Sequence, residues 1–403
     1  MSDTATFHAI HEIAGAIDIP ESAYEKAAAR YKDLADWFGR KEAQCNKYAP
    51  HIYSQGSFRL GTVIRPIDEK GEYDLDTGCR LEAGVTKQNC SQQTLKELVG
   101  ADVEAYRIAS NIQEPTEEKH RCWRLKYADT LKFHLDVVPS IPETIERRRQ
   151  IQEAIIRASD PSDLAMRVAK LTGAITDNRE LNYRIINDAW RLSNSEGFAL
   201  WFEFRMLLAK GLTEDLVIRA RAAKVDKLPA NRWKTPLQRC VQILKRHRDI
   251  KFRNDPDGKP ASIIITTLAA RAYQGEADIP SALARILFTM GNLVRPNVPR
   301  VPNPVNPAED FADRWAKNPT LEANFRKWLE DAQSDFNAIR TEQKPELIIR
   351  AARDKFGASL NETELKAKLG TPPPGGLLKA AATPAGLSFP DKPIVPQKPA
   401  GFA

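Results

Sequence analysis

Two aspartates separated by one residue, Asp74 and Asp76, follow a Gly-Ser pair in the stretch YSQGSFRLGTVIRPIDEKGEYDLDTGCRL. Side chains at positions i and i+2 of a β-strand point to the same face, so these carboxylates would project together. They would repel each other unless a cation lay between them, and Mg²⁺ prefers one or two carboxylates with phosphate oxygens and water. The spacing favours a divalent metal site, although Asp-Leu-Asp also occurs on solvated turns.

A third carboxylate, Asp136, lies in the strand-like run FHLDVVP among apolar neighbours, where an aspartate is unusual unless it faces a site. Three carboxylates on adjacent strands can hold two metal ions for an in-line attack on a phosphate. In the Gly-Ser pair, Gly56 lets the backbone approach closely, and the amides of Ser57 and Phe58 at a helix start can bind phosphate oxygens. The ordered set indicates phosphate chemistry more strongly than any one of its parts.

The elements that must position these residues alternate between helices and short strands. Helical spacing of apolar residues predicts helices over residues 22–47 and 92–109. The β-branched or aromatic runs CRLEA, RCWRLKY and KFHLDVV alternate in polarity and predict strands. Residues 1–145 should therefore combine helices with a small sheet.

After Pro142 the pattern is helical almost throughout, and two segments begin with a predicted capping box. The first box pairs Ser193 with Glu196 in a helix that would stop at Gly211. The second pairs Thr235 with Gln238. In the helix of the second box, four residues fall on one face and should be buried: Leu237, Cys240, Val241 and Leu244.

The composition divides the chain into three parts: residues 1–145, a mainly helical part at 146–370, and a Pro-, Gly- and Ala-rich tail at 371–403, expected to be flexible. The net charge of +7 favours an anionic substrate such as a nucleotide or nucleic acid, although it also serves solubility. No apolar run approaches the ~18 residues of a membrane span, so we expect a soluble, cytoplasmic protein without a membrane partner. The basic run ERRRQ lacks interleaved aromatic residues, which favours a solvated helix face over nucleic-acid binding.

The motifs QGSFRLGT, YDLD and FHLDVVP together resemble the nucleotidyltransferase fold of the DNA polymerase β type. With LQRCVQILKRHRD and NPVNPAEDFADRW, the chain resembles the CD-NTase family, bacterial relatives of cyclic GMP–AMP synthase that make cyclic oligonucleotide signals in anti-phage CBASS defence. The resemblance covers about residues 50–335 and excludes the tail. It implies an α+β protein, with a nucleotidyltransferase lobe carrying a small mixed sheet, a helical C-terminal lobe, and an active-site cleft between them.

By this resemblance, Asp74 and Asp76 bind two metal ions, Mg²⁺ or Mn²⁺, and Asp136 binds the ion nearest the attacking hydroxyl. Asp136 would also help to deprotonate that hydroxyl. These three aspartates are the expected catalytic residues and metal ligands. Seven further residues are expected to contact nucleotides: Gln55, Gly56, Ser57, Arg59, Lys126, Lys245 and Ser262.

The nucleotide contacts differ in what the resemblance implies for them. The Gly-Ser loop and Arg59 would contact the triphosphate. Lys245 would neutralise the triphosphate of the donor nucleotide, and Ser262 would lie near the phosphates of that nucleotide. Lys126 would contact the acceptor nucleotide. Plain structural roles also fit: Arg59 as a surface arginine, Lys245 as a solvated lysine at the border of the apolar face, and Ser262 as an N-cap. His134 is expected to be packed or exposed rather than catalytic.

The implied reaction is attack of a ribose hydroxyl on the α-phosphate of a nucleoside triphosphate, with loss of pyrophosphate. A second such step would close a cyclic di- or trinucleotide, made from ATP, GTP or other nucleoside triphosphates without a nucleic-acid activator. Two alternatives stay open: a template-independent transferase acting on RNA or protein, and a non-catalytic nucleotide-binding scaffold. The base identities, ring size and linkage depend on pocket shape and are not predicted.

The tail ends in PIVPQKPAGFA, where Ile394, Val395 and Phe402 stand isolated in a proline-rich chain. Such segments bind in grooves or add to a sheet edge. The family resemblance implies capture of the tail by a ubiquitin-like conjugation enzyme or a regulatory protein. An inert tail is the alternative.

Overall fold

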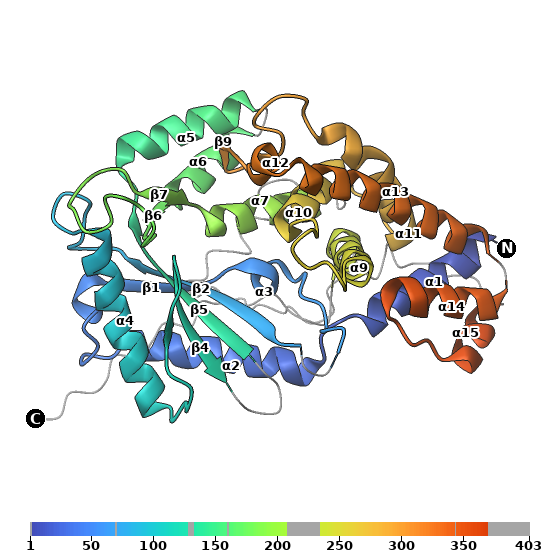
Figure 1. The fold of residues 1–403 in the computed structure, drawn as a ribbon, viewed down its shortest axis with the longest axis horizontal. Coiled ribbons are helices and arrows are strands. Elements are labelled where there is room, and N and C mark those ends of the chain that lie inside the picture. The colour runs from blue at the N-terminus through green and yellow to red at the C-terminus, as the bar shows by residue number, and fades with distance from the viewer. Residues whose placement is uncertain are drawn as a thin grey trace, which may run out of the picture.

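The computed structural model of the chain describes residues 2–68, 71–127, 133–158, 161–207, 234–342 and 344–369. A sheet flanked by helices occupies one end of the molecule, and a body of helices occupies the other (Figure 1). This mixed arrangement confirms the expected α+β class with a small mixed sheet and a helical C-terminal region.

The sheet has seven strands in the described residues, in the order β1-β2-β5-β4-β3, with β6 paired to β5 and β7 paired to β6. The strands are β1 (Pro50–Ser54), β2 (Tyr73–Leu81), β3 (Glu117–Glu118), β4 (Trp123–Tyr127), β5 (Phe133–Pro142), β6 (Gly173–Ile175) and β7 (Arg191–Ser193). β2 and β5 are parallel, while the other neighbours are antiparallel. The two strands that carry the aspartates are therefore direct neighbours.

Alternation along β2 and β5 separates a core face from a polar face. On β5, Phe133, Leu135 and Val137 are fully buried, and on β2 Leu75 is fully buried as well. Residues one position away point to the opposite face. The apolar alternation thus turns the aspartates of both strands to the same side of the sheet.

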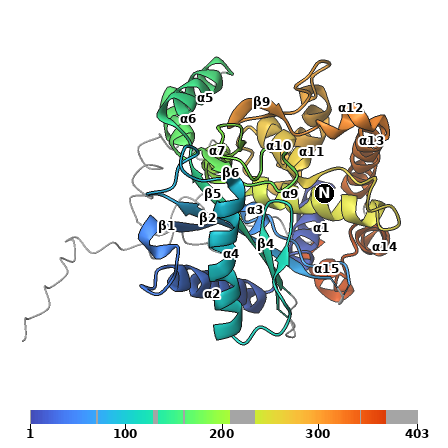
Figure 2. The ribbon, with the colours of Figure 1, turned by 60° about the vertical axis from the view of Figure 1, so that its left-hand side comes forward.

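Two helices cover the apolar face, α2 (Glu21–Phe38) and α4 (Gln92–Ala109), as Figure 1 and Figure 2 show. The predicted range of the second helix is confirmed at both ends, and its first turn is capped by the Ser91 side chain, which accepts from the backbone N–H of Thr94. The first helix ends at Phe38 instead of continuing to residue 47. Residues beyond it form turns and the short 3₁₀ helix η1 (Asn46–Tyr48).

The remaining elements of the described chain are mostly helices. They are α1 (Ser2–Ala16), α3 (Gly56–Leu60), α5 (Ile145–Arg157), α6 (Ser162–Lys170), α7 (Ser195–Leu207), α9 (Pro236–Lys251), α10 (Ser262–Ala272), α11 (Ile279–Thr289), η3 (Met290–Leu293), α12 (Arg314–Lys317), α13 (Pro319–Thr341), α14 (Pro345–Phe356) and α15 (Glu362–Leu369). The proline-rich segment before α12 is not helical and contains the hairpin of β8 (Pro302–Asn303) and β9 (Asn306–Asp310).

Helix α9 agrees closely with its sequence signals. Both hydrogen bonds of the capping box are present: the Thr235 side chain accepts from the backbone N–H of Gln238, and the Gln238 side chain accepts from the backbone N–H of Thr235. The four residues expected on the buried face are at most 2% exposed: Leu237, Cys240, Val241 and Leu244. Its amphipathic pattern was therefore a reliable guide to which face packs inward.

The division at residue 145 does not follow the packing of the chain. Helix α1 packs in the core of the helical part, where Ile10, Ile13 and Ile17 are buried with residues of α9, α11 and α13. The sheet also continues past residue 145 through β6 and β7. These two strands are only three residues long, which is too short for a periodic pattern to reveal them.

The capping box predicted at Ser193 is wrong. Ser193 ends β7, and the helix that follows begins at Ser195. The Asn194 side chain accepts from the backbone N–H of Gly197 at 3.0 Å, so asparagine takes the capping role one position later. The predicted end of this helix at Gly211 and the tail at 371–403 lie outside the described residues.

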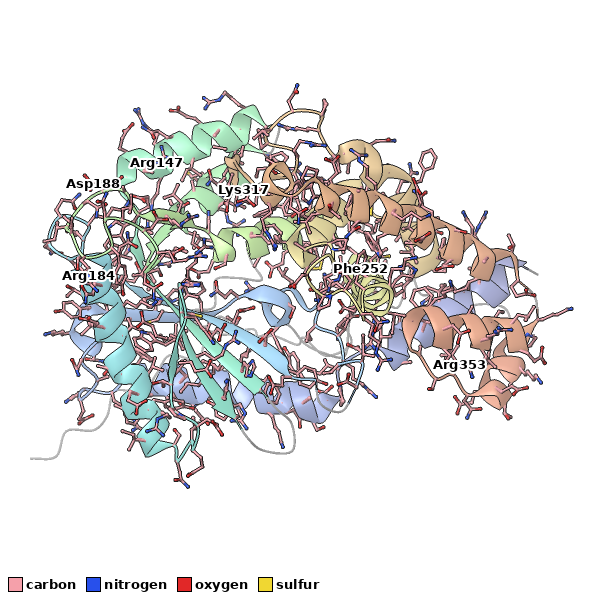
Figure 3. The ribbon with its side chains drawn as sticks, viewed as in Figure 1. Arg147, Arg184, Asp188, Phe252, Lys317 and Arg353 are labelled. Atoms are coloured by element: carbon pink, nitrogen blue, oxygen red, sulfur yellow. The ribbon has the colours of Figure 1, made fainter. Side chains whose placement is uncertain are left out.

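The surface of the described chain bears on two further expectations. No described helix is both long and apolar enough to cross a membrane. The basic run ERRRQ lies on α5, where Arg147 is exposed and points away from the body of the protein (Figure 3).

Candidate active site

Register brings two of the three predicted aspartates side by side. Asp76 on β2 is the direct partner of Asp136 on β5, and Asp74 is the partner of His134. The Asp74 side chain is 67% exposed, whereas that of Asp136 is 15% exposed. Burial raises the pKa of Asp76 to about 7, and the charges of Asp74 and Asp136 add to the rise. All three carboxylates therefore influence one small region at this face of the sheet.

The Gly-Ser turn lies directly against Asp76. The backbone N–H of Gln55 donates to the Asp76 carbonyl at 2.9 Å. Gly56 has a φ of +65°, and a Cβ built at this position would lie 2.0 Å from Oδ2 of Asp76. Glycine is required here by backbone conformation and by space together. The first residues of α3, including the half-buried Ser57, therefore begin beside a predicted metal ligand.

Asp136 has a partner that the sequence did not suggest. Arg124 lies opposite Asp136 on the antiparallel neighbour β4. Its Nε donates to Oδ1 and its Nη2 donates to Oδ2, both at 2.7 Å. The attraction of the carboxylate raises the pKa of the Arg124 guanidinium further above its already high value. Both oxygens of the third predicted ligand are thus engaged by one guanidinium.

Lys245 approaches the site from the helical part of the molecule. Its Nζ donates to the carbonyl of Thr62 at 2.9 Å, just beyond α3. The side chain is buried, so the alternative of a solvated lysine is wrong. Burial, followed by repulsion from Arg248, lowers the pKa of Lys245 to about 8, while the charge of Asp76 acts in the opposite sense. Lys245 and Asp76 are therefore close enough to interact electrostatically.

Lys245 is one of four side chains of α9 that donate to backbone carbonyls in the segment after the Gly-Ser turn. Gln238 reaches Leu60 at 2.9 Å, and Gln242 reaches Val63 at 2.6 Å. Arg246 donates to the carbonyl of Arg65. We call these four donors the α9 ladder: Gln238, Gln242, Lys245 and Arg246. The ladder fixes the helix to the segment that positions the turn.

The other predicted nucleotide contacts have protein partners. Arg59 is buried and donates to Glu203 of α7 at 2.7 Å. Lys126 donates to Glu117 on β3. The N-cap of α10 is Ala261 rather than Ser262, whose hydroxyl accepts from Arg248 at 2.7 Å. None of these contacts was predictable from spacing alone.

His134 lies between two acidic side chains, with Nε2 2.5 Å from Glu72 and Nδ1 3.5 Å from Asp74. It therefore sits next to the carboxylate group as a polar neighbour. This position agrees with a packed histidine.

Asp74, Asp76 and Asp136 are the candidate ligands for a divalent cation. In the described parts of the chain, no three His, Cys, Asp or Glu side chains lie close enough together to hold a metal ion. The donor chemistry nevertheless fits, because Asp76 and Asp136 are direct cross-strand partners and hard divalent cations prefer oxygen ligands. Asp136 can join such a set only if at least one of its two hydrogen bonds from Arg124 breaks. The metal site stays a prediction.

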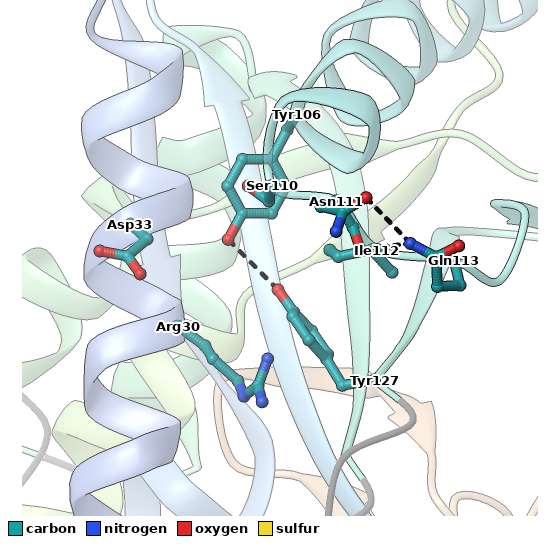
Figure 4. A pocket seen from close by; sticks show the side chains of 8 residues that line it. All are labelled: Arg30, Asp33, Tyr106, Ser110, Asn111, Ile112, Gln113 and Tyr127. Atoms are coloured by element: carbon teal, nitrogen blue, oxygen red, sulfur yellow. Dashed lines mark hydrogen bonds between the residues drawn. The ribbon is translucent and has the colours of Figure 1, made fainter.

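A cavity of about 470 Å³ lies on the other side of the sheet (Figure 4). In its wall the Arg30 guanidinium stacks 3.6 Å from the centre of the Tyr127 ring, and the hydroxyls of Tyr106 and Tyr127 are 3.2 Å apart. Tyr127 and Arg124 are three positions apart on β4, so they face opposite sides of the sheet. None of the predicted site residues lines this cavity.

Residues 50–139 match the model of the nucleotidyltransferase domain of cyclic GMP–AMP synthases of the DncV-like type. That range contains the Gly-Ser turn and all three aspartates. The chain is 29% identical over 323 residues to a c-di-GMP synthase of Roseivirga ehrenbergii, covering 79% of this chain and 73% of that protein. It is 24% identical over 376 residues to the cyclic dinucleotide synthase CdnG of Bradyrhizobium diazoefficiens, covering 88% of this chain and 81% of that protein.

The fold is similar to a solved structure as well. The structure of the CD-NTase CdnG of Bradyrhizobium diazoefficiens in complex with GTP superposes with a TM-score of 0.61 at 22% identity, covering 90% of this chain and 98% of that one. Three of the sequence motifs, QGSFRLGT, YDLD and FHLDVVP, lie within the matched residues. Residues 50–139 therefore match a DncV-like nucleotidyltransferase domain, and the chain as a whole is similar in sequence and fold to bacterial cyclic dinucleotide synthases.

Proposed function

We propose that this protein is a cyclic dinucleotide synthase that joins nucleoside triphosphates, with GTP as the first substrate to test. The choice of GTP rests on the names of two relatives, a c-di-GMP synthase and a CdnG solved with GTP. The observation that carries the proposal is the register of Asp76 against Asp136, with the Gly56 turn held against Asp76. This pairing places carboxylates next to a turn suited to phosphate.

In the proposed reaction, a ribose hydroxyl oxygen forms a bond to the α-phosphorus of a triphosphate. The bond from that phosphorus to the bridging oxygen breaks, and pyrophosphate leaves with the electron pair. The hydroxyl proton passes to Asp136 or to water. A second attack, by the free hydroxyl of the linear product on its own α-phosphate, closes the ring and releases a second pyrophosphate.

Mg²⁺ or Mn²⁺ ions, when bound, would neutralise phosphate charge and make the hydroxyl more acidic. Asp74, Asp76 and Asp136 are the residues that would hold them. The backbone at Gly56 and Ser57 would receive triphosphate oxygens, and the Lys245 ammonium would balance their charge. Each of these roles is supported by position and chemistry.

The test is incubation of the purified protein with labelled GTP, ATP, or both, with Mg²⁺ or Mn²⁺, and identification of products by mass spectrometry. We expect phosphatase-resistant cyclic products without added nucleic acid. Long linear chains, or label found only on added RNA or protein, would instead favour a template-independent transferase. Nucleotide binding without any product would favour a scaffold.

The proposal extends to the biological setting. A cyclic dinucleotide made in the cytoplasm would act as a second messenger, and the family resemblance points to anti-phage defence. Residues 371–403 would then be the segment that a ubiquitin-like conjugation enzyme or a regulatory protein captures. A phage challenge comparing cells that carry the wild-type protein with cells that carry Asp76→Asn would test the defence role.

A further inference from the structure

We propose that Arg124 occupies the carboxylate of Asp136 in the nucleotide-free protein and thereby makes divalent-cation binding depend on the arrival of a triphosphate. This inference rests on the proposed function, because it assumes that Asp136 is a metal ligand. It adds a positioning residue that acts through Asp136.

The geometry of the pair is the first support. Arg124 and Asp136 are cross-strand partners, and two parallel hydrogen bonds of 2.7 Å join them. The Arg124 side chain is 24% exposed and that of Asp136 is 15% exposed, so the pair is largely shielded from water. A bidentate guanidinium–carboxylate pair is among the stronger charge-assisted contacts, and here it uses both carboxylate oxygens.

The balance of charge around the site is the second support. Asp74, Asp76 and Asp136 point to one face of the sheet, and Asp76 is the direct cross-strand partner of Asp136. Neighbouring carboxylates repel each other, and the two hydrogen bonds from Arg124 place a positive charge directly against Asp136. When no divalent cation is bound, the Arg124 guanidinium therefore acts as the counter-charge for these carboxylates.

Lys126 shows that this placement is specific to Arg124. The two residues share a face of β4, because they are two positions apart. Lys126 is bonded to Glu117 on the outer strand, whereas Arg124 turns inward to a predicted metal ligand. The strand thus carries two cations, and one of them is committed to the site.

A divalent cation at Asp136 would lie close to the guanidinium and be repelled by it. A triphosphate changes this balance, because its negative charge attracts the cation and also offers the guanidinium oxygens of matching geometry. Cation and nucleotide should therefore bind together. In the free protein, the cation competes with Arg124 and binds weakly.

The experiment measures Mn²⁺ binding by electron paramagnetic resonance of the free ion, with and without a non-hydrolysable GTP analogue. Wild-type protein should bind Mn²⁺ weakly alone and tightly with the analogue. In the absence of nucleotide, Arg124→Gln should bind Mn²⁺ about tenfold more tightly than wild type. Removing one opposing charge changes the binding free energy by about as much as a shift of one pKa unit, which corresponds to a factor of about ten in affinity. The benefit of adding the analogue should shrink accordingly.

Arg121→Gln is the matched control, since Arg121 is also bonded to a carboxylate, that of Asp177 at 2.8 Å, and lies outside the predicted site. This variant should behave as wild type. If Arg124→Gln does not fold, Arg124→Lys serves in its place. This variant keeps the positive charge but cannot form both hydrogen bonds to Asp136, so its Mn²⁺ affinity without nucleotide should be intermediate.

Three results would overturn the inference. The first is nucleotide-free Mn²⁺ affinity in Arg124→Gln, or in Arg124→Lys where only that variant folds, equal to wild type. The second is wild-type affinity that the analogue does not change. The third is absence of Mn²⁺ binding in every protein even with the analogue, which would also remove the metal site from the proposed function. The first two results leave the proposed function standing, so the two failures are distinguishable.

Discussion

Gly56 is the residue at which backbone conformation and carboxylate position depend on each other. A Cβ here would meet Asp76 Oδ2 at 2.0 Å, on a backbone with a φ of +65°. Gly56→Ala should therefore displace the turn or the carboxylate. A shift of about 1 Å in a catalytic group costs about 10²-fold in rate, and we expect turnover of GTP to fall by at least that much.

Gly15→Ala is the matched control for Gly56→Ala, because nothing lies within 4 Å of a Cβ at position 15 in α1. It should keep full turnover and gain up to about 1 kcal/mol in the free energy of unfolding. Steady-state kinetics measures the turnover of GTP, and urea unfolding measures the free energy of unfolding, in both variants. Full activity in Gly56→Ala would show that the turn does not set the position of Asp76.

Lys245 predicts a pH dependence of nucleotide binding. Its pKa is lowered to about 8, so the ammonium is charged below pH 8 and loses its proton as the pH rises through that value. A bound triphosphate favours the charged form. Binding should weaken above pH 8, and at pH 9 the protein should take up a proton when GTP binds.

Calorimetry of GTP binding in two buffers of different ionisation enthalpy measures this proton uptake. Lys245→Met should abolish it and weaken binding at pH 7. Lys251→Met, on the exposed side of the same helix and paired with Asp331, is the control and should behave as wild type. Unchanged proton uptake in Lys245→Met would assign the titration to another group.

At the scale of elements, the α9 ladder joins the helical part to the nucleotidyltransferase domain. Gln242 is fully buried, and its side-chain amide donates to the Val63 carbonyl at 2.6 Å and to Asp18 at 2.9 Å. Gln242→Leu leaves both acceptors without this donor. Unpaired buried polar groups cost about 1–3 kcal/mol each, so urea unfolding should show a loss of at least about 1 kcal/mol.

The same substitution should raise the KM for GTP, because the ladder holds the segment that follows the Gly-Ser turn. Gln150→Leu on α5 is the control: Gln150 is exposed and bonds to Glu146 and Arg147 within its own helix. That variant should change neither quantity appreciably. A Gln242→Leu protein of normal stability would mean that the ladder contributes nothing to the junction.

The elements also show how far the sequence could predict the fold. Helices α4 and α9 were predictable because their caps and apolar spacing are local signals. Strands β1, β6 and β7 were missed. The three residues of β6 and of β7 carry too little periodicity, and the pairing of all three strands is decided by distant neighbours. The placement of α1 in the helical core depends on contacts with α11 and α13, far away along the chain.

The site was predictable to a different degree. Asp74, Asp76 and Asp136 could be proposed from residue type and strand spacing. Their register could not, because it depends on which strands pair, and the bond from Arg124 to Asp136 follows from that register. The carbonyl acceptors of the α9 ladder were equally hidden, since backbone positions about 180 residues away leave no mark on the local sequence.

At the scale of the whole molecule, the described residues form two hydrophobic cores, one in the helical part and one around the sheet. Removing the last ~20 residues, at a terminus rich in proline and glycine, should leave production of cyclic dinucleotide unchanged in vitro. The same truncation should abolish conjugation or capture by a partner protein. Loss of activity in the purified truncated protein would assign the tail to the fold.

The most direct test of the central claim is the amount of cyclic product that Asp76→Asn makes from GTP, measured by mass spectrometry beside wild type. Asp163→Asn, an exposed carboxylate on α6, is the matched control and should make the wild-type amount. Because Asp76 is the carboxylate that both the turn and Asp136 adjoin, we predict a loss on the order of 10³-fold or more in the Asp76→Asn protein. Near-normal synthesis of the cyclic product by Asp76→Asn would contradict the assignment of this site.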